Sequence, residues 1–182
     1  SKFAGQSDNY FAEKFQYLKF IGIAFICFLL AIKSRSLKFL FFMSIPIYLY
    51  LDDSRQLHER FGTKIASFLH DGNSNDTLIT NFRYQDIGEL LYMLFFGFII
   101  LFIFLICYEL SNTFERHFLK KILKLFIVFG IFAILVDSMH QLSEGFLYNI
   151  LTIIEDGGEM IPISFITAYF FKYLINNRNK NI

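Results

Sequence analysis

The segment from Leu90 to Tyr108, LLYMLFFGFIILFIFLICY, contains no charged residue and decides the fold class of the chain. An α-helix needs about 20 apolar residues to cross the ~30 Å hydrocarbon core of a bilayer. This segment alone nearly reaches that length. We therefore predict that it crosses a membrane as a helix.

The chain contains four shorter apolar segments as well. They are Phe20 to Ile32, Phe39 to Leu51, Leu125 to Val136 and Met160 to Phe171, and each reaches spanning length only with its polar neighbours. The sequence therefore predicts an all-α integral membrane protein with a single domain over residues 1–182. Its five transmembrane helices are expected at approximately 15–32, 37–57, 87–109, 122–142 and 154–174.

The overall composition agrees with a membrane protein. Hydrophobic residues make up 55% of the 182 residues, with 26 Phe and a mean hydropathy of +0.47, which is more apolar surface than one soluble core buries. The net charge is +1 and no basic surface is evident, so we expect membrane lipids as partners and no direct nucleic acid binding. No HExxH, nucleophile elbow or phosphate-binding glycine loop is present, and no catalytic residue is predicted.

Basic residues predict the orientation of the helices. Lys and Arg gather in the connections 33–38 and 116–124 and in the tail 172–180, whereas 138–156 contains neither. Short loops rich in Lys and Arg stay in the cytoplasm. We therefore expect the N-terminus outside and the C-terminus inside. In the second connection, four basic side chains are candidates for binding a cytoplasmic partner: Arg116, Lys120, Lys121 and Lys124.

A short amphipathic helix is expected after the second span. Leu57, Phe61, Ile65 and Phe68 recur at helical spacing before a polar loop. This segment either extends the second span or lies on the outer membrane surface.

Two parts of the chain resemble each other. Leu51–Gln56 can be aligned with Leu135–His140, and Asp86–Leu90 with Asp156–Met160. Because both units run in the same direction, they predict a parallel repeat. The core would be a pseudo-twofold four-helix bundle of spans two and three with spans four and five. The first span would then lie at the periphery or at a contact in a homo-oligomer.

Polar side chains three residues apart gather at the predicted outer helix ends. Asp86 with Glu89 and Asp156 with Glu159 have the spacing of helix-capping residues. Asp53 and Asp137 lie instead at helix C-termini, where the helix dipole disfavours a carboxylate. Another group should therefore stabilise each of them. The alternatives are an arginine (Arg55, Arg60 or Arg83), a bound cation or a proton. The candidates for binding an ion or a metal, such as a divalent cation, are Asp53, Glu89, Asp137, His140, Asp156 and Glu159.

Two segments carry a resemblance to known proteins. LDDSRQLHE at 51–59 and IEDGGEM at 154–160 resemble a group of uncharacterised bacterial multi-spanning membrane proteins. Those proteins have acidic helix ends of the type LDE followed by HE, and EExxEM. The resemblance implies a location in the bacterial inner (plasma) membrane and supplies no activity.

Three functions remain open at this point. The first is a non-enzymatic polytopic subunit that acts as a sensor or as a membrane anchor for a cytoplasmic partner, in a bacterial multi-component system such as stress response or defence. The second is an ion or proton channel or transporter with an outward-facing carboxylate site. The third is a membrane-embedded metalloenzyme in which His140 and the carboxylates hold an activated water.

Overall fold

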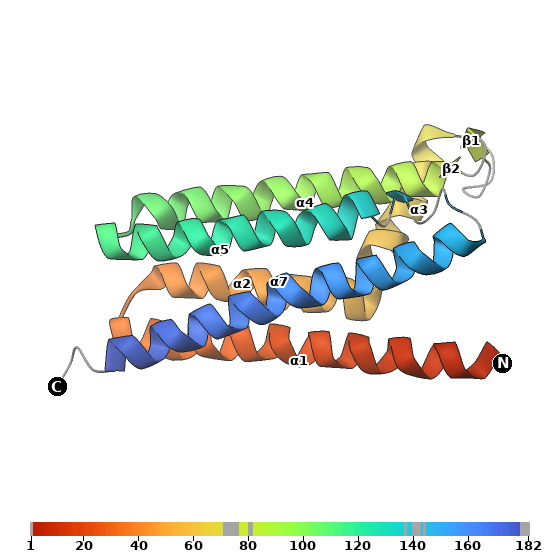
Figure 1. The fold of residues 1–182 in the computed structure, drawn as a ribbon. Helices are drawn as coiled ribbons and strands as arrows, with labels where there is room; N and C mark the ends of the chain where they lie inside the picture. Colours follow the sequence, from red (N-terminus) through yellow and green to blue (C-terminus); the bar gives the residue numbers. More distant parts are fainter. Residues whose placement is uncertain are drawn as a thin grey trace.

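The computed structural model describes residues 2–70, 77–79, 82–136, 138–139, 143 and 145–178. Nearly all of this part of the chain is helical (Figure 1), with one short antiparallel pair of strands. The elements are α1 (Lys2–Ser34), α2 (Leu37–Arg55), α3 (Leu57–Leu69), β1 (Thr77–Ile79), β2 (Phe82–Arg83), α4 (Tyr84–Glu109), α5 (Thr113–Ile131), the π-helix η1 (Phe132–Val136) and α7 (Phe146–Arg178).

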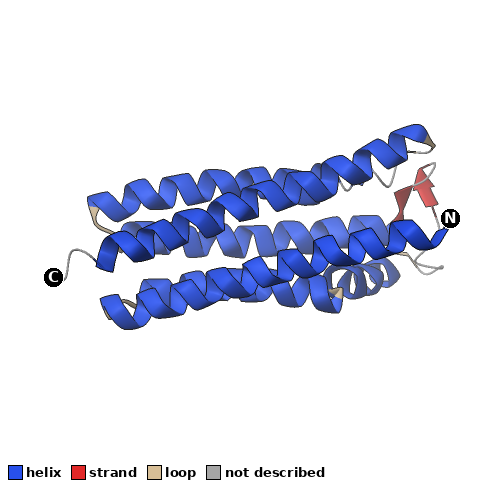
Figure 2. Ribbon diagram, turned by 60° about the horizontal axis from the view of Figure 1, so that its bottom comes forward, coloured by secondary structure: helices blue, strands red, loops and turns tan. Residues whose placement is uncertain are grey.

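Five long helices, α1, α2, α4, α5 and α7, lie side by side along one axis (Figures 1 and 2). Helix α1 packs against α2 and α7, α5 packs against α7 and α4, and α4 packs against α2, so the five form a closed ring. The N-terminus, α3 and the β1–β2 pair lie at one end, which we call the hairpin end. The C-terminus lies at the opposite end, which we call the C-terminal end.

The place of α1 corrects the predicted core. Its side chains Phe20, Ile23, Cys27 and Leu30 are at most 1% exposed and belong to the main hydrophobic cluster. Helix α1 packs between α2 and α7, so the prediction of a four-helix core with a peripheral first span is wrong. All the long helices are apolar on most of their surface, and an apolar pattern alone does not tell which helix faces the centre.

Two helix boundaries also differ from the prediction. Helix α2 ends at Arg55, because Gln56 adopts a left-handed conformation (φ 50°), and the amphipathic segment forms the separate helix α3. Helix α7 begins at Phe146, so Asp156 and Glu159 lie well inside it and do not cap a helix start. By contrast, Asp86 lies in the first turn of α4, as the capping interpretation predicted.

The C-terminal half of the ring is filled by aromatic and aliphatic side chains. The ring of Phe42 meets Phe104 at 4.8 Å and Phe170 at 6.2 Å between centroids. Below them, Glu115 of α5 forms an ion pair with Lys38 of α2 and accepts a hydrogen bond from the Tyr173 hydroxyl of α7 (3.4 Å). Three helices are thus joined at this end.

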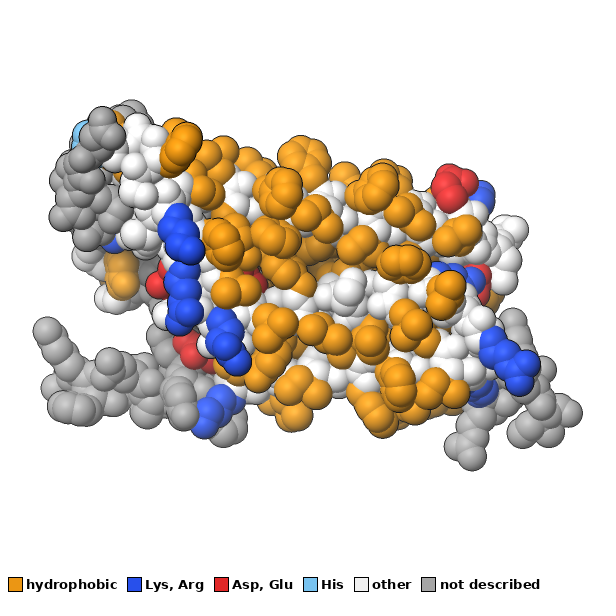
Figure 3. Space-filling view, turned by 180° about the vertical axis from the view of Figure 1, so that it is seen from behind, with side chains coloured by type: hydrophobic (Ala, Val, Ile, Leu, Met, Phe, Trp, Pro, Cys, Tyr) orange, Lys and Arg blue, Asp and Glu red, His pale blue; other side chains and the backbone are white. Residues whose placement is uncertain are grey.

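The outer surface of the bundle is apolar over its middle. Figure 3 shows a broad band of hydrophobic side chains between charged side chains at the two ends of one face. Among the described residues, two helices are long and apolar enough to cross a membrane, Glu13–Ser34 and Tyr84–Glu109. The crossing of a membrane by the five long helices stays a prediction.

Candidate binding chamber

A cavity of about 830 Å³ lies inside the ring toward the hairpin end. All five long helices line it, together with the first turn of α3 and with η1. On the side of the C-terminal end its lining stops at Ile100, Leu101 and Leu123. We call this cavity the chamber.

Acidic side chains dominate the polar lining of the chamber. In the part of the chain that the structure describes, the basic lining residues are His58 and Arg83. The described residues supply seven carboxylates to the lining, those of Glu13, Asp52, Asp53, Glu59, Glu89, Glu155 and Glu159.

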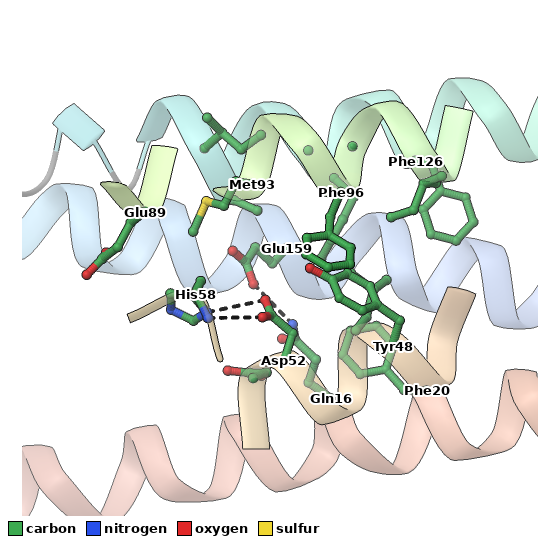
Figure 4. A pocket seen from close by; sticks show the side chains of 18 of the residues that line it. Gln16, Phe20, Tyr48, Asp52, His58, Glu89, Met93, Phe96, Phe126 and Glu159 are labelled. Atoms are coloured by element: carbon green, nitrogen blue, oxygen red, sulfur yellow. Dashed lines mark hydrogen bonds and ion pairs between the residues drawn. The ribbon is translucent and has the colours of Figure 1, made fainter. Parts of the chain in front are cut away.

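His58 is held by Asp52 across the turn between α2 and α3. The left-handed turn at Gln56 brings the first turn of α3 back over the end of α2. The backbone N–H of His58 donates to Asp52 Oδ1 (3.1 Å), and its ring Nδ1 lies 3.2 Å from Asp52 Oδ2 (Figure 4). Burial lowers the pKa of His58, but the hydrogen bond and charge of Asp52, with the charges of Glu89 and Glu59, more than offset it. The net pKa is therefore raised above 6.5.

Arg83 is engaged at the start of α4. Its Nη2 donates to Asp86 Oδ1 (2.7 Å), and its backbone N–H donates to Asp86 Oδ2 (2.7 Å). The hydrogen bond with the nearly buried Asp86 is the main cause of a raised pKa of Arg83. The Arg83 charge is thus directed at a carboxylate that is not among the chamber residues.

Two glutamates of the chamber accept hydrogen bonds from neutral amides. Gln85 Nε2 donates to Glu89 Oε1 (2.8 Å), and Gln16 Nε2 donates to Glu159 Oε2 (3.0 Å), which joins α1 to α7. The amide of Gln85 carries no charge that could neutralise Glu89.

An arginine was one of the three groups expected to stabilise Asp53, beside a bound cation and a proton. Within the described residues, no hydrogen bond or ion pair joins its side chain to an Arg or Lys, and Arg55 and Arg60 are exposed. Arg83 is bound to Asp86. Of the three alternatives, the arginine partner is wrong for this part of the chain, and the bound cation and the proton stay predictions.

The remaining wall of the chamber is aromatic and aliphatic. Tyr48 and Phe96 are stacked with ring centroids 4.5 Å apart and an interplanar angle of 13°. Figure 4 shows Tyr48, Phe96, Phe20 and Phe126 together on the side of the chamber away from His58. The chamber thus has an acidic part and an aromatic part.

The structure brings three predicted site residues together and does not test the others. Asp53, Glu89 and Glu159, from three different helices, all line the chamber. Asp137 and His140 lie outside the described residues, as does the side chain of Asp156. Among the side chains that are described, no group of three His, Cys, Asp or Glu is arranged to hold a metal ion.

Sequence reasoning did not select several chamber residues, above all Asp52, His58 and Glu13. One signal was available: His58 follows Asp52 by six residues across a helix end, so a turn can bring the two side chains together. Glu13 could not be found in this way, because it reaches the chamber from α1, which was assigned to the periphery.

The basic side chains of α5 lie near the C-terminal end. Lys120, Lys121 and Lys124 are exposed. Arg116 lies over the Tyr108 ring (4.9 Å) and donates to the Ser111 carbonyl (3.0 Å), while Lys121 lies over the Tyr169 ring (5.9 Å). These cations rest on aromatic rings, as is common where long basic side chains meet a membrane surface.

Comparison with known proteins gives one match. A family described as "Domain of unknown function (DUF8692)" matches residues 16–173. The chain belongs to this family. The match to the DUF8692 family covers most of the length of the five long helices and every chamber residue except Glu13. No curated protein and no solved structure matches the chain.

Proposed function

We propose that this protein is a non-enzymatic membrane subunit of five spans that senses a ligand through an outward-facing chamber. The observation that carries the proposal is the contrast along the ring. The chamber occupies the hairpin half, and the packed side chains of Phe42, Phe104 and Phe170 occupy the other half. A cavity that ends inside the bundle favours binding over passage.

Charge and surface support the membrane part of the proposal. Basic residues of the 33–38 connection and of α5 meet at the C-terminal end, which is the pattern of a cytoplasmic face. The apolar middle of the bundle has the surface that lipid chains require (Figure 3). Five spans then place the N-terminus outside and the C-terminus inside, in the bacterial inner membrane that the sequence resemblance implies.

Helix α3 fits a position at the outer membrane surface. It packs on α4 through its smallest residues, Gly62 and Ala66, which are buried. Phe68 is 92% exposed and Phe61 and Leu69 are exposed beside it. Apolar side chains on one face of a short helix insert at the boundary between lipid headgroups and acyl chains.

The basic side chains of α5 are the proposed contact for a cytoplasmic partner. Arg116, Lys120, Lys121 and Lys124 follow one another at helical spacing near the cytoplasmic end. A sensor needs such a contact to pass its signal on, and assembly with further copies of the chain would add to it.

Orientation is tested by labelling single cysteines in spheroplasts. Gln85→Cys at the chamber and His117→Cys on α5 are each introduced after Cys27→Ala and Cys107→Ala. A maleimide that cannot cross membranes is expected to label Gln85→Cys in intact spheroplasts and His117→Cys only after permeabilisation. The opposite pattern, or labelling of both at once, contradicts the proposed topology.

An ion pathway is the second candidate, because the carboxylates Asp53, Glu89 and Glu159 lie together inside the ring. A sensor and an ion pathway differ in whether ions cross the membrane through the protein. Proteoliposomes that hold a sensor pass Na⁺, K⁺ and H⁺ no faster than empty vesicles. Saturable flux that is lost on Asp53→Asn would replace the sensor by a channel or transporter.

A further inference from the structure

The size of the chamber distinguishes a small-molecule ligand from a bare ion. Its volume is about 830 Å³. A water molecule takes about 30 Å³ of liquid, and binding sites for small molecules range over roughly 300–1,000 Å³. A single metal ion would leave most of the chamber to water, whereas an organic molecule of moderate size fills it.

The charges around the chamber determine the charge of that molecule. Of the two basic lining residues in the described part of the chain, Arg83 is bound to Asp86 and His58 to Asp52. Glu89 accepts only from the neutral amide of Gln85 among the hydrogen bonds given for it, and Asp53 has no Arg or Lys partner there. In a cavity with low-dielectric walls, such an excess of carboxylates attracts a cation and repels an anion.

The aromatic wall determines the rest of the ligand. The parallel rings of Tyr48 and Phe96 lie 4.5 Å apart, and Phe20 and Phe126 lie beside them (Figure 4). A hydrated inorganic cation loses water against such a wall and gains little in return. An organic cation buries its apolar groups there and so removes apolar surface from water.

We infer that the chamber binds an amphiphilic organic cation, with its charged group among Asp53, Glu89 and Glu159 and its apolar body against Tyr48 and Phe96. This inference rests on the proposed function and names the ligand class of the same chamber. A quaternary ammonium or phosphonium ion with aromatic or aliphatic substituents has this chemistry.

Three probes test the ligand class with the wild-type full-length protein in lipid nanodiscs. Tetraphenylphosphonium has both the positive charge and the apolar body. Tetraphenylborate has nearly the same shape with a negative charge, and tetramethylammonium has the charge with little apolar body. Equilibrium dialysis, with empty nanodiscs subtracted for partition into lipid, should give saturable binding of tetraphenylphosphonium, at least tenfold weaker binding of tetramethylammonium, and none of tetraphenylborate.

Two variants test the assigned residues. Asp53→Asn keeps the side-chain shape and removes the charge, and we expect tetraphenylphosphonium to bind about tenfold more weakly, a loss of about 1.4 kcal/mol. Glu109→Gln removes one carboxylate at the C-terminal end, where Glu109 is 76% exposed, and should leave binding unchanged. Size-exclusion chromatography and circular dichroism check that both variants fold. If Asp53→Asn fails to fold, the comparison of the three probes on the wild-type protein still decides the ligand class.

The outcomes separate this inference from the proposed function. Equal binding of tetraphenylborate would overturn the charge assignment, and equal binding of tetramethylammonium would reduce the chamber to a simple cation site. Absence of saturable tetraphenylphosphonium binding, with Gln85→Cys still labelled from outside and no ion flux, overturns the inference and leaves the outward-facing chamber in place. Absence of outside labelling overturns the proposed orientation, whatever the probes do.

Discussion

The two ends of the bundle are built from the same long helices and hold them in different ways. At the C-terminal end, Glu115 joins Lys38 and Tyr173, and aromatic rings fill the space between the helices. At the hairpin end, carboxylates from several helices face one cavity, and α3 covers the end of α4. Like charges favour separation and opposite charges favour contact. Attraction therefore holds the helices together at the C-terminal end, whereas the helices surround a cavity at the hairpin end.

The substitution with the largest expected effect on stability lies at the contact of α3 with α4. A Cβ at Gly88 would lie 2.2 Å from the backbone oxygen of Gly62, and backbone atoms cannot yield as a flexible side chain does. Gly88→Ala should therefore force α3 away from α4 and lower the free energy of unfolding by about 3 kcal/mol. Thermal unfolding in detergent measures this loss.

Gly97 provides the matched control on the same helix, since a Cβ there has no neighbour within 4 Å. Gly97→Ala should change stability by less than about 1 kcal/mol, in the stabilising direction, because Ala is the better helix former. Equal effects of the two substitutions would mean that α3 is not held close to α4.

A smaller loss of folding stability is expected from a substitution at the C-terminal end. Lys38 and Glu115 are each 13% exposed, so Glu115→Gln weakens a largely shielded ion pair. We expect a loss of about 2 kcal/mol, within the range for hydrogen bonds to charged groups. Chemical denaturation in mixed micelles measures it.

The control is the exposed pair of Glu109 with Arg116, at 3.5 Å. Glu109→Gln should cost less than about 0.5 kcal/mol, because water screens exposed pairs. If both substitutions have the same small effect, Glu115 does not anchor the C-terminal end.

The smallest effect is a dependence on pH at the hairpin end. His58 faces Asp52, Glu59 and Glu89, and its pKa in the folded protein is raised above 6.5. Protonated His58 therefore stabilises the folded state fully below pH 6.5, and this contribution is lost as the pH rises through the folded pKa. Hydrogen exchange in α3 is measured at two pH values, one below 6.5 and one above the folded pKa of His58, and is corrected for its intrinsic pH dependence. The α3 amides should open more frequently at the higher of the two pH values.

Two controls accompany the exchange measurement. Asp52→Asn removes the main partner of His58 and should abolish most of the difference between the two pH values. The amides of α5 beside Glu115 should show no such difference. A pH effect that is as large in α5 as in α3 would contradict a local cause.

The sequence predicted those features that depend on one helix at a time. The long apolar segments lie in helices, and Asp86 caps α4 because its carboxylate accepts the Arg83 N–H at the helix start. One prediction went beyond single helices: Asp53, Glu89 and Glu159 line one chamber, since alternating helix directions bring these parts of α2, α4 and α7 to the same half of the bundle.

Features that depend on packing between helices could not be predicted. The place of α1 in the ring, between α2 and α7, follows from which faces of several apolar helices meet, and periodicity says nothing about that choice. The turn at Gln56 needs a left-handed conformation that Gly or Asn usually adopts, so Gln gave no signal. The start of α7 at Phe146 was not predicted, because Asp156 and Glu159 have the spacing of helix-capping residues and indicated a later start.

Chemical modification at Met93, which lines the chamber, shows from which side of the membrane the chamber is open. In the cysteine-free background, Met93→Cys is treated with a trimethylammonium methanethiosulfonate and with its sulfonate counterpart, in right-side-out and inside-out vesicles. An acidic chamber that opens outward predicts fast modification by the cationic reagent in right-side-out vesicles, slow modification by the anionic one, and none by either in inside-out vesicles. Equal modification from both sides would show an open pathway, and no modification from either side would show that the chamber is not accessible.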